Sequence, residues 1–87
     1  GMNDLDFSSQ IVLYPNPTNH QVTIVNNSAK QLLTATMFDI NGRIINKIDL
    51  SNSGLETIIQ VMSYAKGVYF IKIDTEKESI IKRFIKK

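Results

Sequence analysis

The side chains that most often carry catalysis are scarce in this chain. It has 87 residues, a single histidine, His20, and no cysteine. The lack of cysteine excludes thiolate nucleophiles, thiolate zinc sites and disulfides built from this sequence. His20 follows Asn19 in a turn, with no carboxylate or serine near it in sequence. We therefore expect a solvated loop histidine and not a general base.

The carboxylates form no recognisable reactive or metal-binding pattern. No stretch has the alternating acidic residues of a calcium loop, and neither a phosphate loop nor a nucleophile elbow occurs. Asp39 has a local role, because its side chain is placed to accept amides of the turn at Asn41 and Gly42. The sequence therefore predicts no enzyme, no cofactor and no metal site. The carboxylates considered are Asp39, Asp49, Glu56, Asp74, Glu76 and Glu78.

Positive charge is concentrated at one place, the end of the chain. The net charge is only +2, and no basic patch is interleaved with aromatics, so we expect no nucleic-acid partner. No apolar run approaches the ~20 residues of a membrane helix, so we expect no membrane insertion. The terminal cations have two interpretations: a solvated edge that discourages aggregation, or a recognition tail. Charge alone favours the solvated edge. These cations are Lys82, Arg83, Lys86 and Lys87.

The elements that would position this tail are two strands at the C-terminus. Residues 68–75 are rich in β-branched and aromatic types, and Gly67 precedes them where a strand would leave a bend. Alternation places Tyr69, Ile71 and Ile73 on one apolar face. A polar turn over 75–78 leads to residues 79–87, whose apolar spacing fits a strand or a helical turn. The β-rich segment before it favours a strand.

Five more strands are expected upstream, separated by turn residues. Pro15, Asn16 and Pro17 interrupt the chain because proline has no backbone donor, and Asn41-Gly42 is the strongest hairpin signal. About seven short strands at roughly ten-residue spacing predict an all-β protein, an antiparallel sandwich of two sheets. The five upstream strands are expected over residues 11–14, 21–26, 31–39, 43–50 and 55–61.

Period-two alternation also predicts which side chains face the core. Val22 and Ile24 share one face of the second strand. In the fifth strand, Leu55 is expected on the same face as Ile59 and Val61. For residues 43–50 the pattern does not decide which face is buried.

The length predicts one domain. Residues 1–10 are polar, with only Leu5 and Phe7 as apolar anchors, and are expected to be a linker or a disordered N-terminal segment. The folded domain is expected over 11–87. Gly1 before Met2 is typical of a residue left by an expression tag, so the sequence is compatible with a fragment of a longer protein.

Several motifs together resemble a known family, the type A C-terminal sorting domain of type IX secretion cargo. They occur in the family's order and cover the chain from about Leu13 to its last residue. One departure is Tyr64-Ala65-Lys66, where the family more often has a leucine before the small-residue, lysine and glycine step. The motifs are Tyr14-Pro15-Asn16-Pro17, Val22-Thr23-Ile24, Phe38-Asp39 to Asn41-Gly42-Arg43, Gly67 to Ile73, and Lys82 to Lys87.

The resemblance implies an Ig-like β-sandwich at the end of a larger exported protein of Bacteroidetes-type bacteria. Such a domain passes through the periplasm and ends secreted or at the outer-membrane cell surface. Its implied partners are the type IX translocon, a sortase-like peptidase that cleaves in the linker before Ile11, and a covalently linked N-terminal cargo domain. The implied translocon-recognition residues are Gly67, Tyr69, Lys82, Arg83, Phe84, Ile85, Lys86 and Lys87. Pro15, Asn16, Pro17, Asp39, Asn41 and Gly42 would be structural turn residues.

Other functions predict different surfaces. An Ig-like or fibronectin-like adhesion or carbohydrate-binding module would expose Tyr14, Phe38, Tyr64 or Phe70 as an apolar platform. The sorting domain instead predicts these rings largely buried and no ligand pocket. A fibronectin-like spacer with no partner of its own would need neither an exposed aromatic face nor the basic C-terminal tail. An unprotected terminal strand also predicts a strand-exchanged dimer.

Overall fold

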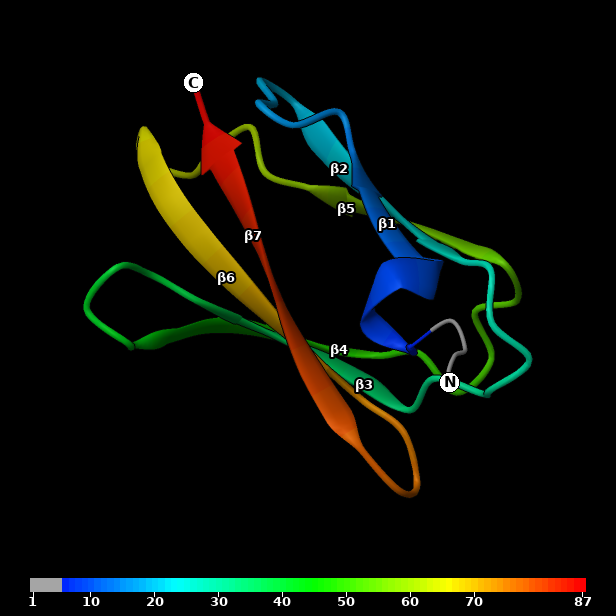
Figure 1. Ribbon diagram of the computed structural model, residues 1–87. Helices are drawn as coiled ribbons and strands as arrows, with labels where there is room; N and C mark the ends of the chain where they lie inside the picture. Colours follow the sequence, from blue (N-terminus) through cyan, green and yellow to red (C-terminus); the bar gives the residue numbers. More distant parts are fainter. Residues whose placement is uncertain (1–5) are drawn as a thin grey trace.

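The computed structural model describes residues 6–87, which form seven strands in two antiparallel sheets. The three-stranded sheet has the order β1-β2-β5, and the four-stranded sheet has the order β4-β3-β6-β7. Figure 1 shows the sheets as two facing layers. The predicted all-β sandwich is therefore confirmed. The strands are β1 (Ile11–Tyr14), β2 (Gln21–Asn26), β3 (Thr34–Phe38), β4 (Ile44–Asp49), β5 (Glu56–Gln60), β6 (Gly67–Asp74) and β7 (Ser79–Lys86).

The core lies between the inner faces of the two sheets, as alternation predicts. Val22 and Ile24 of β2 are buried, and they face Ile71 and Ile73 of β6 and Met37 of β3 across the sandwich. Every second side chain of β6 enters this core, at Tyr69, Ile71 and Ile73, because successive side chains point to opposite faces. No helix among residues 6–87 is long and apolar enough to cross a bilayer.

Leu55 differs from the predicted pattern. It was expected to share the buried face of Ile59 and Val61, but it is 73% exposed, whereas those two residues are buried. The reason is that β5 begins only at Glu56. Leu55 still belongs to the preceding turn, where its carbonyl accepts a hydrogen bond from Asn26 N–H while its side chain points to solvent.

The segment before β1 packs against the domain. Phe7 is buried in the core, and Ser8–Gln10 form a short 3-10 helix, η1. The ammonium of Lys30 lies 5.5 Å from the centre of the Phe7 ring and also pairs with the Glu78 carboxylate. The domain boundary was predicted between residues 10 and 11, yet packing extends to Phe7. Residues 1–5 of the predicted linker lie outside the described residues.

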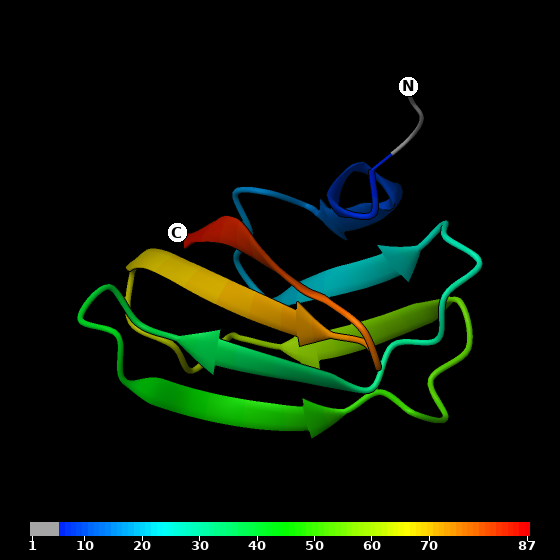
Figure 2. The same ribbon diagram turned by 60° about the horizontal axis from the view of Figure 1, so that its bottom comes forward.

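The two sheets differ at their edges. In Figure 2, β4 and β7 border the four-stranded sheet, and β1 and β5 border the three-stranded sheet. Five of the six β4 residues are exposed, and only Ile48 is half-buried. The edges of β4 and β7 are therefore the parts of the larger sheet that a partner can reach.

Candidate functional site

The C-terminal hairpin is the longest ladder of the fold. β6 and β7 pair antiparallel over eight residue pairs, from Gly67 opposite Lys86 to Asp74 opposite Ser79. The turn is closed by Thr75, whose N–H donates to Glu78 O at 2.8 Å and whose hydroxyl oxygen accepts from Glu78 N–H at 3.1 Å. This confirms the strand that the sequence favoured over a helix for the last residues. The hairpin fixes the direction of every side chain that the resemblance assigns to recognition.

The predicted recognition residues divide between the two faces of β7. Phe84 and Lys86 point into the sandwich and are buried, with Phe84 completely inaccessible. Arg83, Ile85 and Lys87 are exposed. The interpretation of all four terminal cations as solvated is therefore wrong for Lys86, which is 7% exposed. Its ammonium donates to the main-chain oxygen of Lys87 at 3.1 Å.

Two aromatic rings attach β7 to the core. Tyr69 and Phe84 are directly opposite in the ladder, and their rings are stacked with centres 5.4 Å apart. Tyr69 also donates its hydroxyl hydrogen to Ala65 O at 2.6 Å. The ring of Tyr64 also packs against Tyr69, tilted by 49° with centres 5.4 Å apart. Stacked rings of this kind contribute about 0.5–1.5 kcal/mol beyond their burial, so Tyr69 and Phe84 position the strand.

Gly67 begins β6 in a conformation that other residues rarely adopt. Its φ is +151°, although a Cβ added there would meet nothing within 4 Å. A larger residue is therefore disfavoured by the backbone conformation and not by lack of room for a side chain, because only glycine populates this region readily. Gly67 faces Lys86 across the ladder and sets the point at which the hairpin leaves the preceding connection.

The proline-flanked turn covers half of the outer edge of β7. Asn16 acts like a strand residue through its side chain: Nδ2 donates to Arg83 O at 3.1 Å, and Oδ1 accepts from Ile85 N–H at 3.0 Å. Thr18 continues this pairing through its backbone, with its N–H to Ile85 O and Lys87 N–H to its carbonyl, both at 2.9 Å. The predicted turn at Pro15, Asn16 and Pro17 thus also closes the edge from Arg83 to Lys87. No sequence pattern indicates this contact, which joins residues 67 positions apart.

The other half of the same edge is open. Because backbone groups alternate along a strand, the groups of Ile81 point to the same side as those of Arg83 and Ile85. Among residues 6–87, no hydrogen bond from another segment reaches the outward groups of Ile81. The outward backbone groups that no hydrogen bond from another segment reaches are those of Ser79 and Ile81, whereas the Arg83 carbonyl is already occupied by Asn16.

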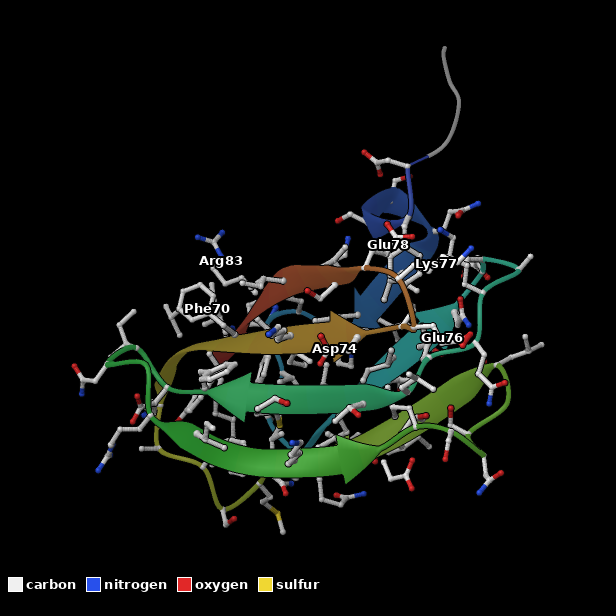
Figure 3. The ribbon with its side chains drawn as sticks, turned by 90° about the horizontal axis from the view of Figure 1, so that it is seen from below. Phe70, Asp74, Glu76, Lys77, Glu78 and Arg83 are labelled. Carbon is white, nitrogen blue, oxygen red and sulfur yellow. The ribbon has the colours of Figure 1, made fainter. Side chains whose placement is uncertain are left out.

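Arg83 and the carboxylates of the hairpin lie at different places along its length. In Figure 3, Phe70 and Arg83 lie side by side near one end, whereas Asp74 and the turn residues Glu76, Lys77 and Glu78 lie at the other. Phe70 and Arg83 are also directly paired in the ladder. An exposed guanidinium beside a half-buried ring is a contact point suited to protein recognition.

The second predicted turn is organised around Asp39. Its Oδ1 accepts from the N–H groups of Asn41 at 2.9 Å and Arg43 at 3.0 Å, and its Oδ2 accepts from Arg43 Nε at 2.9 Å. The Arg43 N–H, with help from the Arg43 side chain and the Asn41 N–H, lowers the pKa of the Asp39 carboxyl. Gly42 completes the turn with a φ of +83°. The local role predicted for Asp39, Asn41 and Gly42 agrees with this geometry.

The aromatic residues named by the adhesion alternative do not form one platform. Phe38 and Phe70 are neighbours on the outer face of the four-stranded sheet, where both are half-buried. Tyr14 lies on the three-stranded sheet and is 46% exposed, so the prediction that it would be buried is wrong. It is exposed because it ends β1 opposite Thr23, on the face directed away from the core. Tyr64 is half-buried, because its ring packs against Tyr69.

The described surface has hollows but no cluster of reactive groups. A hollow of about 530 Å³ lies between the Asp39 turn and the connection before β6, bordered by Arg43, Lys66 and Gly67. Among residues 6–87, no group of three histidine, cysteine or acidic residues is placed to hold a metal ion. His20 is exposed in its turn.

Comparison with known proteins agrees with this architecture. The family described as "Secretion system C-terminal sorting domain" matches residues 12–87. Among solved structures, the fold is similar to a DUF3244 family protein from Bacteroides vulgatus with an immunoglobulin-like β-sandwich. That match has a TM-score of 0.77 at 16% identity, and it covers 97% of this chain and 92% of the other. A search of curated proteins gave no significant match.

Proposed function

The chain belongs to the family of secretion system C-terminal sorting domains, and we propose that it directs an attached cargo protein through the outer membrane by the type IX system. The observation that carries this proposal is the family match over residues 12–87, which includes all seven strands except Ile11, the first residue of β1. The family is one of sorting signals and not of enzymes. The domain acts by presenting a surface, and no chemical step is required of it.

The surface we propose for the translocon is the exposed side of β7. Arg83 and Lys87 supply positive charge, and the open edge from Ser79 to Ile81 supplies backbone groups for an added strand. Strand addition uses main-chain hydrogen bonds for affinity and neighbouring side chains for specificity. Because Asn16 and Thr18 already occupy the edge from the Arg83 carbonyl to Lys87, strand addition is limited to the first half of β7 unless the turn moves.

The buried members of the predicted recognition set have a different role in this proposal. Tyr69 and Phe84 hold β7 against β6, and Gly67 sets the start of the hairpin. They act as positioning residues for Arg83 and Lys87. Replacing them would therefore change export through loss of the folded strand and not through loss of a direct contact.

Export of the cargo is proposed to end in the outer medium or at the cell surface, with removal of the domain by a sortase-like peptidase. Because Phe7 is buried in the core, we propose that cleavage falls upstream of Phe7. Mass spectrometry of the released domain would test this. A new N-terminus between Phe7 and Ile11 would contradict it.

The direct test uses surface variants that keep the fold. The domain is fused to a periplasmic reporter in a bacterium with a type IX translocon, and secreted reporter is compared with periplasmic reporter. Arg83→Glu with Lys87→Glu is expected to retain the reporter in the periplasm. Lys66→Glu with Lys77→Glu is the matched control, because it makes the same change in charge at two exposed positions outside β7.

Thermal unfolding of both double variants shows whether the folded domain is kept. Equal export of the β7 variant and the control, with both folded, would contradict the proposed surface. Equal export of a fusion that lacks the domain altogether would contradict the sorting function itself. These two failures are distinguishable in one experiment.

A further inference from the structure

The four edge strands of the sandwich are not equally protected. β7 is half covered by Asn16 and Thr18, and its own residues carry only positive charge. β1 has only four residues and is followed directly by Pro15. Proline, charge and short length are the usual means by which proteins prevent edge strands from pairing with other chains. The edge on the opposite side, β4, has six residues and no proline, and its two charged residues, Lys47 and Asp49, have opposite signs.

β4 is also the strand that an approaching molecule meets first. Figures 2 and 3 show it as the outermost strand on its side of the sandwich, beyond β5 of the smaller sheet. Since the opposite layer has one strand fewer, the inward-facing Asn46 is exposed and Ile48 is only half-buried. A strand that pairs with β4 would therefore cover apolar surface as well as backbone groups.

The ladder shows which β4 backbone groups face outward. Leu50 N–H donates to Leu33 O at 2.8 Å, so Leu50, Ile48 and Asn46 direct their backbone groups toward β3. Lys47 and Asp49 consequently face the open edge. The Lys47 N–H also donates to the side chain of its own neighbour, Asn46 Oδ1, at 2.9 Å.

The β4 edge has one irregular end and one straight end. The register shifts between Met37 and Phe38, which pair with Asn46 and Ile44, so Ile45 is left without a partner across the ladder. A bulge of this kind increases the local twist and hinders pairing there. The straight part from Asn46 to Asp49 is therefore the segment available to a second strand.

We propose that β4 is a self-association edge, at which a second copy of this chain pairs antiparallel with Ile48 on the two-fold axis. In this register Lys47 of each copy lies opposite Asp49 of the other, on the outer face, and the two pairs are reciprocal. Moving the register by one pair would place Lys47 opposite Lys47, and like charges directly opposite are unfavourable. Charge complementarity thus selects both the partner and the register.

Asn46 acts as a competitor for this pairing. Its side chain occupies the Lys47 N–H that the second copy needs, so that hydrogen bond must open first. Only the segment from Asn46 to Asp49 of each copy is available for pairing, so we expect a weak association. The pairing leaves the whole of β7 and Gly67 free, and it is therefore independent of translocon recognition.

Sedimentation equilibrium of the full chain, at concentrations up to about 1 mM, tests the proposal with two charge variants. Lys47→Glu places Glu opposite Asp49, and Asp49→Lys places Lys opposite Lys47, so each variant alone is expected to dimerise about tenfold more weakly than the original. An equimolar mixture restores both opposite-charge pairs and is expected to associate at least as strongly as the original chain. Loss of folding in either variant would not produce recovery on mixing.

Two further variants keep the result decisive. Asn46→Val removes the competing side chain and is expected to tighten the dimer severalfold. Ile81→Pro removes an outward N–H from β7 instead of β4 and is expected to leave the association unchanged. A chain that stays monomeric with and without Asn46→Val overturns the proposal, as does a dimer that survives in both charge variants or is lost in Ile81→Pro.

Discussion

Asn16 closes the outer edge of β7 at Ile85, where its side-chain Oδ1 accepts the backbone N–H at 3.0 Å. The same side chain donates to Arg83 O, so one amide group satisfies two backbone groups of the edge. A side-chain amide can do this because it carries a donor and an acceptor with the spacing of a peptide group. The contact joins the connection after β1 to the last strand of the fold. It prevents other strands from pairing at the C-terminal half of β7.

Replacing Asn16 with alanine is expected to destabilise the domain by about 1 kcal/mol, because two exposed hydrogen bonds are lost. The newly open edge is also expected to cause association that increases with protein concentration. Urea unfolding and light scattering measure the two effects. Asn19→Ala is the control, since Asn19 lies in the same exposed bend. Equal behaviour of the two variants would show that Asn16 does not protect the edge.

The hairpin that carries this edge was largely predictable from sequence. In β6 one face of the strand is buried, so the period of two assigned Tyr69, Ile71 and Ile73 to the core without further information. The burial of Lys86 was also predictable from its position in the strand. It has the same parity as Phe84, and side chains of one parity share a face of the strand. The expectation that Lys86 is solvated followed from its charge and not from its position in the strand.

The cap by Asn16 was not predictable in the same way. Asn16 and Arg83 are 67 residues apart in the chain, and no periodic pattern connects them. The prolines on either side of Asn16 did predict that its segment is no central strand. They did not indicate which edge the side chain would reach, because that depends on the relative position of the two sheets.

Replacing Phe84 with alanine is expected to cost about 3–5 kcal/mol, because a fully buried ring is removed and a cavity remains. Ile81 lies in the same strand, but its side chain is on the outer face. Ile81→Ala is expected to change the free energy of unfolding by less than about 0.5 kcal/mol. Ile81 is 63% exposed, which makes it the matched control in the same strand. Chemical denaturation gives both values. A small effect of Phe84→Ala would mean that β7 is not held by the core.

Replacement by asparagine is expected to cost more stability at Gly67 than at Gly42. Asparagine adopts the left-handed conformation readily, so Gly42→Asn at a φ of +83° should change stability by only a few tenths of a kcal/mol. Gly67→Asn, at a φ of +151°, should cost about 1–3 kcal/mol, because that region is almost restricted to glycine. Melting temperatures of the two variants provide the comparison. Equal losses would show that the backbone at Gly67 relaxes.

The Asp39 turn is expected to make the domain sensitive to acid. The pKa of Asp39 is lowered in the folded state, chiefly by the Arg43 N–H, so the folded chain binds a proton less readily than the unfolded chain. The stabilisation is therefore complete above the ordinary aspartate pKa of about 4 and is lost as the pH falls below it. The same direction holds for Asp49, whose pKa is lowered by the Ser51 hydroxyl and N–H. Melting temperatures between about pH 6 and pH 2 should fall less steeply for Asp39→Asn than for the original chain, because asparagine does not titrate. Parallel curves for the two proteins would show that the charge on Asp39 contributes nothing to the stability of the turn.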